Sequence, residues 1–276
     1  MSPQSKKIGD IEVTPLSDGV LTTSLDVVLG LDRPEIERLS GKNFGDPIPI
    51  SVNAFLLKIG RKRMLVDAGS GNTMGPTLGK LPENLRALGV APDDIDSILL
   101  THLHPDHSNG LVDDEGGAIY RNAEIVLHAN EASFWLDRDP ASGPSERIRR
   151  NIAKSAVTTK PYRSRMRSVG EGEVLPGVSA LPLPGHTPGH TGWLIEGAAD
   201  ALLIWGDLVH LAAMQVARPD TGLVFDVDPQ AACATRRRMF DRVAADRLKV
   251  AGAHLDFPGF GTIVRKGSEF RYEPED

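Results

Sequence analysis

Cysteine is nearly absent from this sequence. The 276 residues contain one, Cys233, so no disulfide can form within the chain, as is typical of proteins from a reducing compartment. A secretory signal is also not expected, because no apolar run follows Lys6 and Lys7 near the start. We therefore predict a cytoplasmic protein.

Long hydrophobic runs are missing as well. The most apolar stretch, residues 201–217, is interrupted by Gly206, Asp207 and His210. It falls short of the ~18 uninterrupted apolar residues that a membrane span needs, and we expect no membrane partner. The remaining composition, with 40% hydrophobic and 25% charged residues, is ordinary for a globular enzyme.

The chain also lacks the excess of positive charge that a general nucleic-acid binder carries. Its formal net charge is −6, so we predict no nucleic-acid partner. One segment departs from this balance, since residues 147–167 contain eight basic residues and no acidic one. Such a run is usually a solvated helix and loop, although contact with a partner or a second subunit is an alternative.

Turn residues divide the sequence into short strands and helices. Gly-Arg-Lys between two apolar runs predicts a hairpin, and Pro229 after Asp228 predicts the start of a long helix. The expected strands are residues 51–59, 63–69, 95–100, 123–129, 178–183, 192–197, 199–207 and 248–254. The expected helices are residues 81–89, 130–137 and 228–246, so the pattern is that of an α/β protein.

Potential metal ligands follow four of the apolar runs. His102 comes after "SILL", His186 after "ALPLPG", Asp207 after "ALLIWG" and His254 after "LKVAGA". In α/β proteins, loops converge on functional sites at the carboxyl ends of the strands. We therefore expect these four side chains to lie close together.

The densest cluster of potential ligands is "HLHPDH". In an extended backbone His102 and His104 point the same way, so both imidazoles can reach one metal ion. Pro105 favours an extended His104 and suits the start of a helix, which directs Asp106 and His107 elsewhere. The hexapeptide therefore offers two nitrogens to one ion, and a carboxylate with a nitrogen to a second. Imidazole and carboxylate together favour zinc, with manganese or iron as alternatives.

These motifs resemble the metallo-β-lactamase superfamily. "THLHPDH", "GHTPGH", an isolated Gly-Asp and a late Ala-His carry the resemblance, which covers about residues 50–265. Through "LVDAGSG", "EASFWL" and "AHLDFPGFG" the chain is most similar to the branch with methyl parathion hydrolase and related lactonases and aryl esterases. The resemblance implies an αββα four-layer sandwich of two mixed sheets with outer helices. It also implies a single domain over residues 1–276, with two β/α halves at roughly 1–170 and 171–276.

The resemblance implies a ligand set for two divalent metal ions, zinc by expectation. The first ion is held by His102, His104 and His186, the second by Asp106, His107 and His254, and Asp207 bridges both. True β-lactamases use a cysteine at their second zinc, where this chain has Asp207, and this disfavours antibiotic hydrolysis. The diiron oxygen-reducing members have a glutamate in place of His104, and this difference disfavours redox chemistry.

Two such ions predict a hydrolase. Cations ~3.5–4 Å apart lower the pKa of a bridging water from ~15.7 to about 7, so a hydroxide is available to attack a carbonyl or phosphorus centre. Asp207 as the bridging ligand and Asp106 as a donor of a proton to the leaving group are the candidate catalytic residues.

Further residues are expected around the metals. Asp67 and His190 are predicted to support the ligands from behind, because an outer hydrogen bond fixes the tautomer of a ligating imidazole. The candidate pocket residues are Met74, Phe134, Trp135 and His210. Met74 falls where the parathion-hydrolysing relatives have an aromatic side chain.

The leading hypothesis is a dinuclear-metal hydrolase of lactones and aryl esters, with organophosphate triesters as a further substrate class. The enzymatic alternatives are a thioesterase of the glyoxalase II kind and a lactonase that opens acyl-homoserine lactones. A different class is a non-catalytic metal-bound module whose basic segment, residues 147–167, binds a partner. We expect a small-molecule substrate, and the resemblance implies a homodimer.

Overall fold

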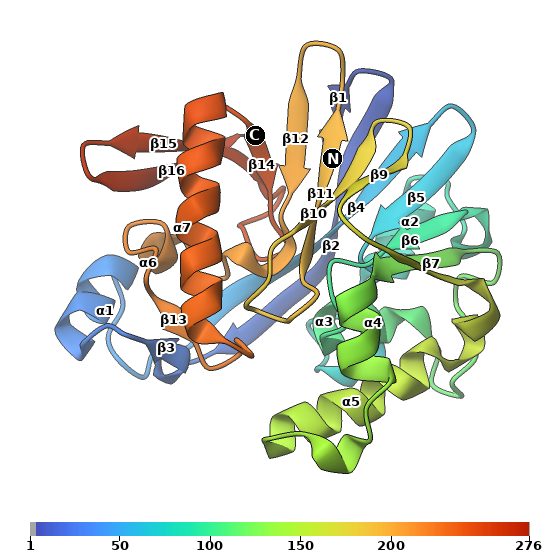
Figure 1. Ribbon diagram of the computed structural model, residues 1–276, viewed down its shortest axis with the longest axis horizontal. Coiled ribbons are helices and arrows are strands. Elements are labelled where there is room, and N and C mark those ends of the chain that lie inside the picture. Colours follow the sequence, from blue (N-terminus) through green and yellow to red (C-terminus); the bar gives the residue numbers. More distant parts are fainter. Residues whose placement is uncertain (1–3, 276) are drawn as a thin grey trace.

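The protein consists of two seven-stranded sheets that pack face to face (Figure 1). The computed structural model describes residues 4–275. The first sheet has the order β1 (Lys6–Ile8), β2 (Ile11–Thr23), β4 (Ile48–Ile59), β5 (Lys62–Val66), β6 (Ser97–Leu99), β7 (Glu124–His128) and β8 (Met166–Val169). The second has the order β16 (Glu269–Glu275), β15 (Phe260–Lys266), β14 (Lys249–Ala251), β12 (Ala201–Ile204), β11 (Thr191–Glu196), β10 (Val178–Pro182) and β9 (Gly172–Leu175). Both sheets mix parallel and antiparallel pairs, which confirms the predicted sandwich.

Helices cover the outer face of each sheet. The helices are α1 (Arg33–Ser40), α2 (Leu81–Ala87), α3 (Pro105–Ser108), α4 (Ala129–Leu136), α5 (Glu146–Thr159), α6 (Ala212–Gln215) and α7 (Pro229–Asp246). α2, α4 and α5 share a buried core with the first sheet, and α7 packs on the second (Figure 1). A small sheet of β3 (Val28–Leu29) and β13 (Gly222–Leu223) lies beside α1 and α6. Within residues 4–275 no helix has both the length and the apolar character needed to cross a bilayer.

The apolar runs of the sequence form strands that are buried on both faces. In β4, Phe55 and Leu57 point into the seam between the sheets, while Leu56 packs under the helices of the first sheet. In β12, Ile204 points into the same seam and Leu203 packs against α7. Because side chains alternate along a strand, a strand with two buried faces is apolar throughout.

Several predicted strands end earlier than expected, and two of these ends, at Val66 and Ile204, position the site. The strand predicted over residues 63–69 stops at Val66 because Asp67 has a left-handed φ of 63°. The strand predicted over residues 199–207 stops at Ile204, and Gly206 turns the chain with a φ of 55°. Left-handed backbone interrupts a β ladder, so the next side chains project beyond the sheet edge.

Candidate metal centre

Metal-ligating side chains gather beyond the carboxyl ends of β6, β12 and β14. Within each of three groups the ligand atoms lie within 4.8 Å of one another: His102, His104, His186 and Asp207; Asp106, His107 and His254; and Asp207, His210 and His254. The structure therefore brings together all seven side chains that the sequence predicts as ligands. It also adds His210, which the sequence placed only in the pocket.

The carboxylate of Asp207 lies at the centre of these groups. Its Oδ2 is 3.0 Å from Nε2 of His210, 3.2 Å from Nε2 of both His186 and His254, and 3.6 Å from Nε2 of His102. Its Oδ1 is 3.0 Å from Nε2 of His107. Burial alone raises the pKa of Asp207, but the surrounding imidazoles outweigh burial and hold this pKa well below its usual value. Asp207 therefore occupies the position that a bridging ligand needs.

The local backbone explains how "HLHPDH" serves both groups. His104 is extended, with φ −70° and ψ 157°, and α3 begins at Pro105 as predicted. His107, in α3, is oriented by Asp67, whose Oδ2 accepts a hydrogen bond from Nδ1 of His107 at 2.8 Å. Asp67 also accepts two hydrogen bonds from Thr101, from its backbone N–H and its hydroxyl. This contact turns Nε2 of His107 toward Asp207, as expected for the supporting role of Asp67.

Asp226 orients His186 in the same manner, and this role is not apparent from the sequence. Nδ1 of His186 donates to Oδ1 of Asp226 at 2.9 Å, and Oδ2 of Asp226 accepts from the backbone N–H of Leu223. Burial lowers the pKa of His186, but hydrogen bonds to Asp207 and Asp226 outweigh burial and raise this pKa to about 9. Asp226 lies 40 residues from His186 in a loop before α7, and no motif marks it.

His190 supports the backbone of Asp207 and belongs to neither predicted ligand group. Its Nδ1 donates to the carbonyl of Leu183 at 2.9 Å, and its Nε2 accepts from the N–H of Asp207 at 3.0 Å. Burial lowers the pKa of His190 to about 3, so the ring is neutral and can accept this bond. Gly206 permits the contact, because a Cβ there would lie 2.7 Å from Nε2 of His190.

Glu131 ties together the loops that carry the first group. The fully buried carboxylate accepts hydrogen bonds from the N–H of Leu103 (2.9 Å), Nε1 of Trp135 (2.6 Å), the hydroxyl of Thr187 (2.7 Å) and the N–H of Gly189 (3.1 Å). Leu103 lies between two predicted ligands, and Thr187 follows a third. Burial raises the pKa of Glu131, and the four donors oppose that rise. The sequence analysis missed this residue because it lies within a predicted helix.

The donor set fits two divalent metal ions. Within residues 4–275, Nε2 of His102 is buried without a hydrogen-bond partner, and Nε2 of His107 and Oδ1 of Asp207, although 3.0 Å apart, make no hydrogen bond with each other or with another residue. Buried polar atoms are normally paired, so unpaired atoms that face one another indicate a missing ligand. Burial also lowers the pKa of His102 and His104 well below the usual value, which keeps both imidazoles neutral and able to bind a metal. The His/Asp clusters therefore form a dinuclear metal site.

A cavity of about 170 Å³ opens onto both groups. Met74 and His210 line it, as predicted, together with Leu21, Ile50, Pro105, Arg147, Arg150, Asn151, Phe225 and five of the predicted ligands. Phe134 and Trp135 are not part of this lining. Trp135 is fully buried behind His104, with ring centroids 5.5 Å apart, and Phe134 packs edge-on against Trp135. The hydrogen bond from Trp135 to Glu131 holds the indole away from the cavity.

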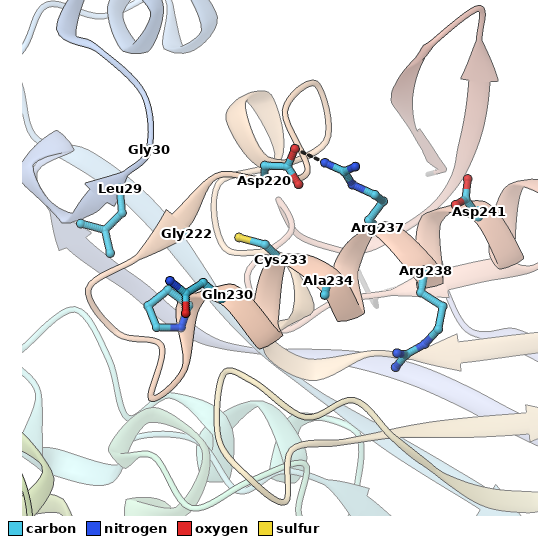
Figure 2. A pocket seen from close by; sticks show the side chains of 11 residues that line it. Leu29, Gly30, Asp220, Gly222, Gln230, Cys233, Ala234, Arg237, Arg238 and Asp241 are labelled. Atoms are coloured by element: carbon cyan, nitrogen blue, oxygen red, sulfur yellow. Dashed lines mark hydrogen bonds and ion pairs between the residues drawn. The ribbon is translucent and has the colours of Figure 1, made fainter.

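A larger hollow of about 870 Å³ lies elsewhere, between the β3/β13 sheet and α7 (Figure 2). Its walls include Leu29, Cys233 and Arg237, and Arg237 is paired with Asp220. It contains none of the clustered histidines. The smaller cavity is therefore the candidate active site.

Comparison with known proteins agrees with this geometry. The hydrolase AbOPH of the beta lactamase superfamily is 31% identical, with a TM-score of 0.92 and coverage of 99% of this chain and 97% of that chain. AidC, a dizinc quorum-quenching lactonase solved with the product N-hexanoyl-L-homoserine, is 26% identical, with a TM-score of 0.91 and the same coverage of both chains.

Similarity to curated proteins covers a shorter stretch. The N-acyl homoserine lactonase of Bacillus thuringiensis is 29% identical over 171 residues, which is 55% of this chain and 61% of that lactonase. The comparisons do not single out methyl parathion hydrolase and its relatives, so that closer resemblance stays a prediction. The model of the family described as "Metallo-beta-lactamase superfamily" matches residues 47–254, which is most of the sequence. The chain belongs to the metallo-beta-lactamase superfamily.

Proposed function

We propose that this protein is a metal-dependent hydrolase that opens the lactone ring of N-acyl homoserine lactones. The observation that carries the proposal is that metal-ligating side chains of both predicted groups face one cavity, part of whose wall is apolar. Similarity to AidC and to the Bacillus lactonase supports the substrate class. Zinc as the metal and a homodimeric state are part of the proposal.

The residues that would hold the metals are those of the two groups. His102, His104 and His186 would bind one ion, Asp106, His107 and His254 the other, and Asp207 would lie between them. When bound, two divalent ions lower the pKa of a coordinated water and polarise a carbonyl oxygen. Asp67 and Asp226 keep Nε2 of His107 and Nε2 of His186 directed at the ions.

The remaining cavity residues would bind and orient the substrate. Leu21, Ile50 and Met74 offer apolar contacts to an acyl chain and exclude water from the scissile bond. Asp106 lines the cavity, with Oδ2 3.4 Å from Nε2 of His254, so its carboxylate can accept a proton from the attacking water and pass it to the departing ring oxygen. Nδ1 of His210 is buried without a hydrogen-bond partner among residues 4–275 and can bond to the substrate.

Aryl esters and organophosphate triesters are a second substrate class, and we rank it lower. Phe225 is the one phenyl or indole ring in the lining, because Phe134 and Trp135 lie outside it. An aromatic leaving group therefore has little surface on which to stack. Because the chain is similar to the hydrolase AbOPH, an aryl ester and an organophosphate triester are still included in the substrate panel.

A substrate panel on zinc-loaded protein tests the proposal. We expect N-hexanoyl-homoserine lactone to have a higher kcat/KM than an aryl ester, a thioester such as S-lactoylglutathione, or methyl parathion. Asp207→Asn and His102→Ala should abolish turnover while the far-ultraviolet circular dichroism stays unchanged. Faster thioester cleavage would favour the glyoxalase II alternative, and no turnover of any ester would favour a non-catalytic module.

A further inference from the structure

The basic segment of the sequence reaches the active-site cavity through the first turns of α5. Arg147, Arg150 and Asn151 belong to the cavity lining, together with His186 and Asp207. Residues three and four apart share one face of a helix, so these three side chains present a common surface. Part of a segment expected to be solvated therefore faces the substrate.

Neither guanidinium has a carboxylate partner among residues 4–275. Arg147 is half-buried, and Nη1 donates to the carbonyl of Phe225 at 2.8 Å, which fixes the guanidinium on the cavity wall. Arg150 is exposed, and its guanidinium makes no hydrogen bond within the described part of the chain. The carboxylate of Asp226 acts on Arg147 from a distance, but His186 and Leu223 already occupy its two oxygens. Since a guanidinium has five N–H donors, most of those at this face stay available.

Asn151 adds an unpaired polar group to the same wall. Asn151 is 7% exposed, and its side-chain amide makes no hydrogen bond to any other residue between 4 and 275. An amide that lines the cavity without a protein partner, beside two guanidiniums without a carboxylate partner, suits a ligand with oxygen acceptors.

Helix stability does not account for these charges. Arg147 lies in the first turn of α5, near the positive end of the helix dipole, where a cation is unfavourable. Burial lowers the pKa of Arg147, and the like charge of Arg150 acts in the same direction. An anion bound between the two guanidiniums would offset both the cost of burying the charge of Arg147 and its repulsion by Arg150.

We propose that Arg147, Arg150 and Asn151 bind a carboxylate carried by the acyl group of the substrate, so that this hydrolase prefers acidic acyl lactones. The guanidinium fork matches a carboxylate in shape and charge, and the Asn151 amide can donate a further hydrogen bond. The inference rests on the proposed lactonase function for the identity of the bond that is cleaved. The binding of the acyl carboxylate does not depend on it.

A matched pair of substrates tests the subsite on zinc-loaded protein. N-succinyl-homoserine lactone and N-butanoyl-homoserine lactone have acyl chains of equal length and differ in a terminal carboxylate against a methyl group. We expect kcat/KM to be at least about 10-fold higher for the succinyl substrate, which is the lower range for a charge-assisted hydrogen bond. In the double variant Arg147→Gln/Arg150→Gln the ratio should fall to about one.

A control variant and a binding measurement separate the two proposals. Arg149→Gln, on the same helix but outside the cavity lining, should keep the wild-type ratio. If both lactones are cleaved and the double variant does not change the ratio of their kcat/KM values, the subsite is wrong. The proposed lactonase function is then still supported. If neither lactone is cleaved, calorimetry compares the open acids N-succinyl-homoserine and N-butanoyl-homoserine. Tighter binding of the succinyl acid that depends on Arg147 and Arg150 supports the subsite, and equal binding overturns it.

Discussion

Replacing Glu131 by glutamine tests how the first donor group is held in place. The carboxylate accepts four hydrogen bonds, two on each oxygen. Glutamine has nearly the same shape, but one oxygen becomes an NH₂ group that can only donate. The hydroxyl of Thr187 can rotate to accept from it, whereas the N–H of Gly189 is left without an acceptor.

The magnitude follows from these four bonds. An unpaired buried donor costs about 1–3 kcal/mol, and each of the two bonds kept by the remaining oxygen weakens by about 1 kcal/mol when the charge is lost. Part of this is recovered because burial disfavours the charged form of Glu131, as its raised pKa indicates. We therefore expect Glu131→Gln to reduce the free energy of unfolding by about 2–4 kcal/mol. The affinity for zinc should fall about 10–100-fold, the range for loss of an outer support.

Urea unfolding of zinc-free and zinc-loaded protein measures the change in the free energy of unfolding. Competition with a chelator measures the change in zinc affinity. Glu124→Gln is the matched control, because the carboxylate of Glu124 is half-exposed and forms a surface ion pair with Arg167. Its substitution should change the free energy of unfolding by less than about 0.5 kcal/mol. If Glu131→Gln behaves like this control in both assays, Glu131 does not hold the loops.

Three further predictions concern other buried groups. Asp67→Asn should lower zinc affinity about 10–100-fold in chelator competition, because an amide cannot replace both acceptor oxygens behind His107; asparagine tolerates the left-handed backbone, and unchanged affinity would contradict the proposed orientation. Arg236→Met should destabilise the protein by about 3–5 kcal/mol in urea unfolding, because three backbone carbonyls lose a buried donor. The exposed neighbour substitution Arg237→Met should change it by less than about 0.5 kcal/mol, and equal effects would argue against this cause. Burial raises the pKa of Tyr162 to about 12, so its contribution to stability is complete below the unfolded pKa of ~10 and is lost as pH rises toward 12. The loss is ~1.4 kcal/mol per pH unit, so Tyr162→Phe should flatten the alkaline stability curve, whereas parallel curves would refute the assignment.

The predicted ligands could be found from the sequence because local rules position them. "HLHPDH" follows a buried strand, and Pro105 alone sets both the extended His104 and the start of α3. The other ligands likewise follow apolar runs that end at the same edge. Strand register then brings the loops together without further information from the sequence.

Two of the supporting carboxylates, Glu131 and Asp226, could not be found in this way. Glu131 contacts residues 28, 56 and 58 positions away, and Asp226 contacts one 40 positions away. Only the packing of the sheets decides those partners. The burial of Trp135 has the same origin, because its hydrogen bond to Glu131 depends on how α4 docks.

Some elements of the fold were missed for local reasons. β2 contains Pro15 and a register shift near Gly19, and both disturb the alternation that marks a strand. α5 was expected as part of a solvated helix and loop, or as a contact with a partner or a second subunit, because residues 147–167 contain eight basic residues and no acidic one. Which side of α5 faces the cavity depends on how the helix packs in three dimensions, and there Arg147 and Arg150 line the cavity.

The two donor groups that contain residues of "HLHPDH" each draw on both halves of the chain, and this sets the order of events during synthesis. The first group is complete only when Asp207 has left the ribosome, and the second only when His254 has followed. Metal loading is therefore a late event, after most of both sheets has been made. Because a ligand that binds only the native state stabilises it by about 4 kcal/mol at a thousandfold excess over Kd, the lifetime of this protein in a cell should follow the zinc supply.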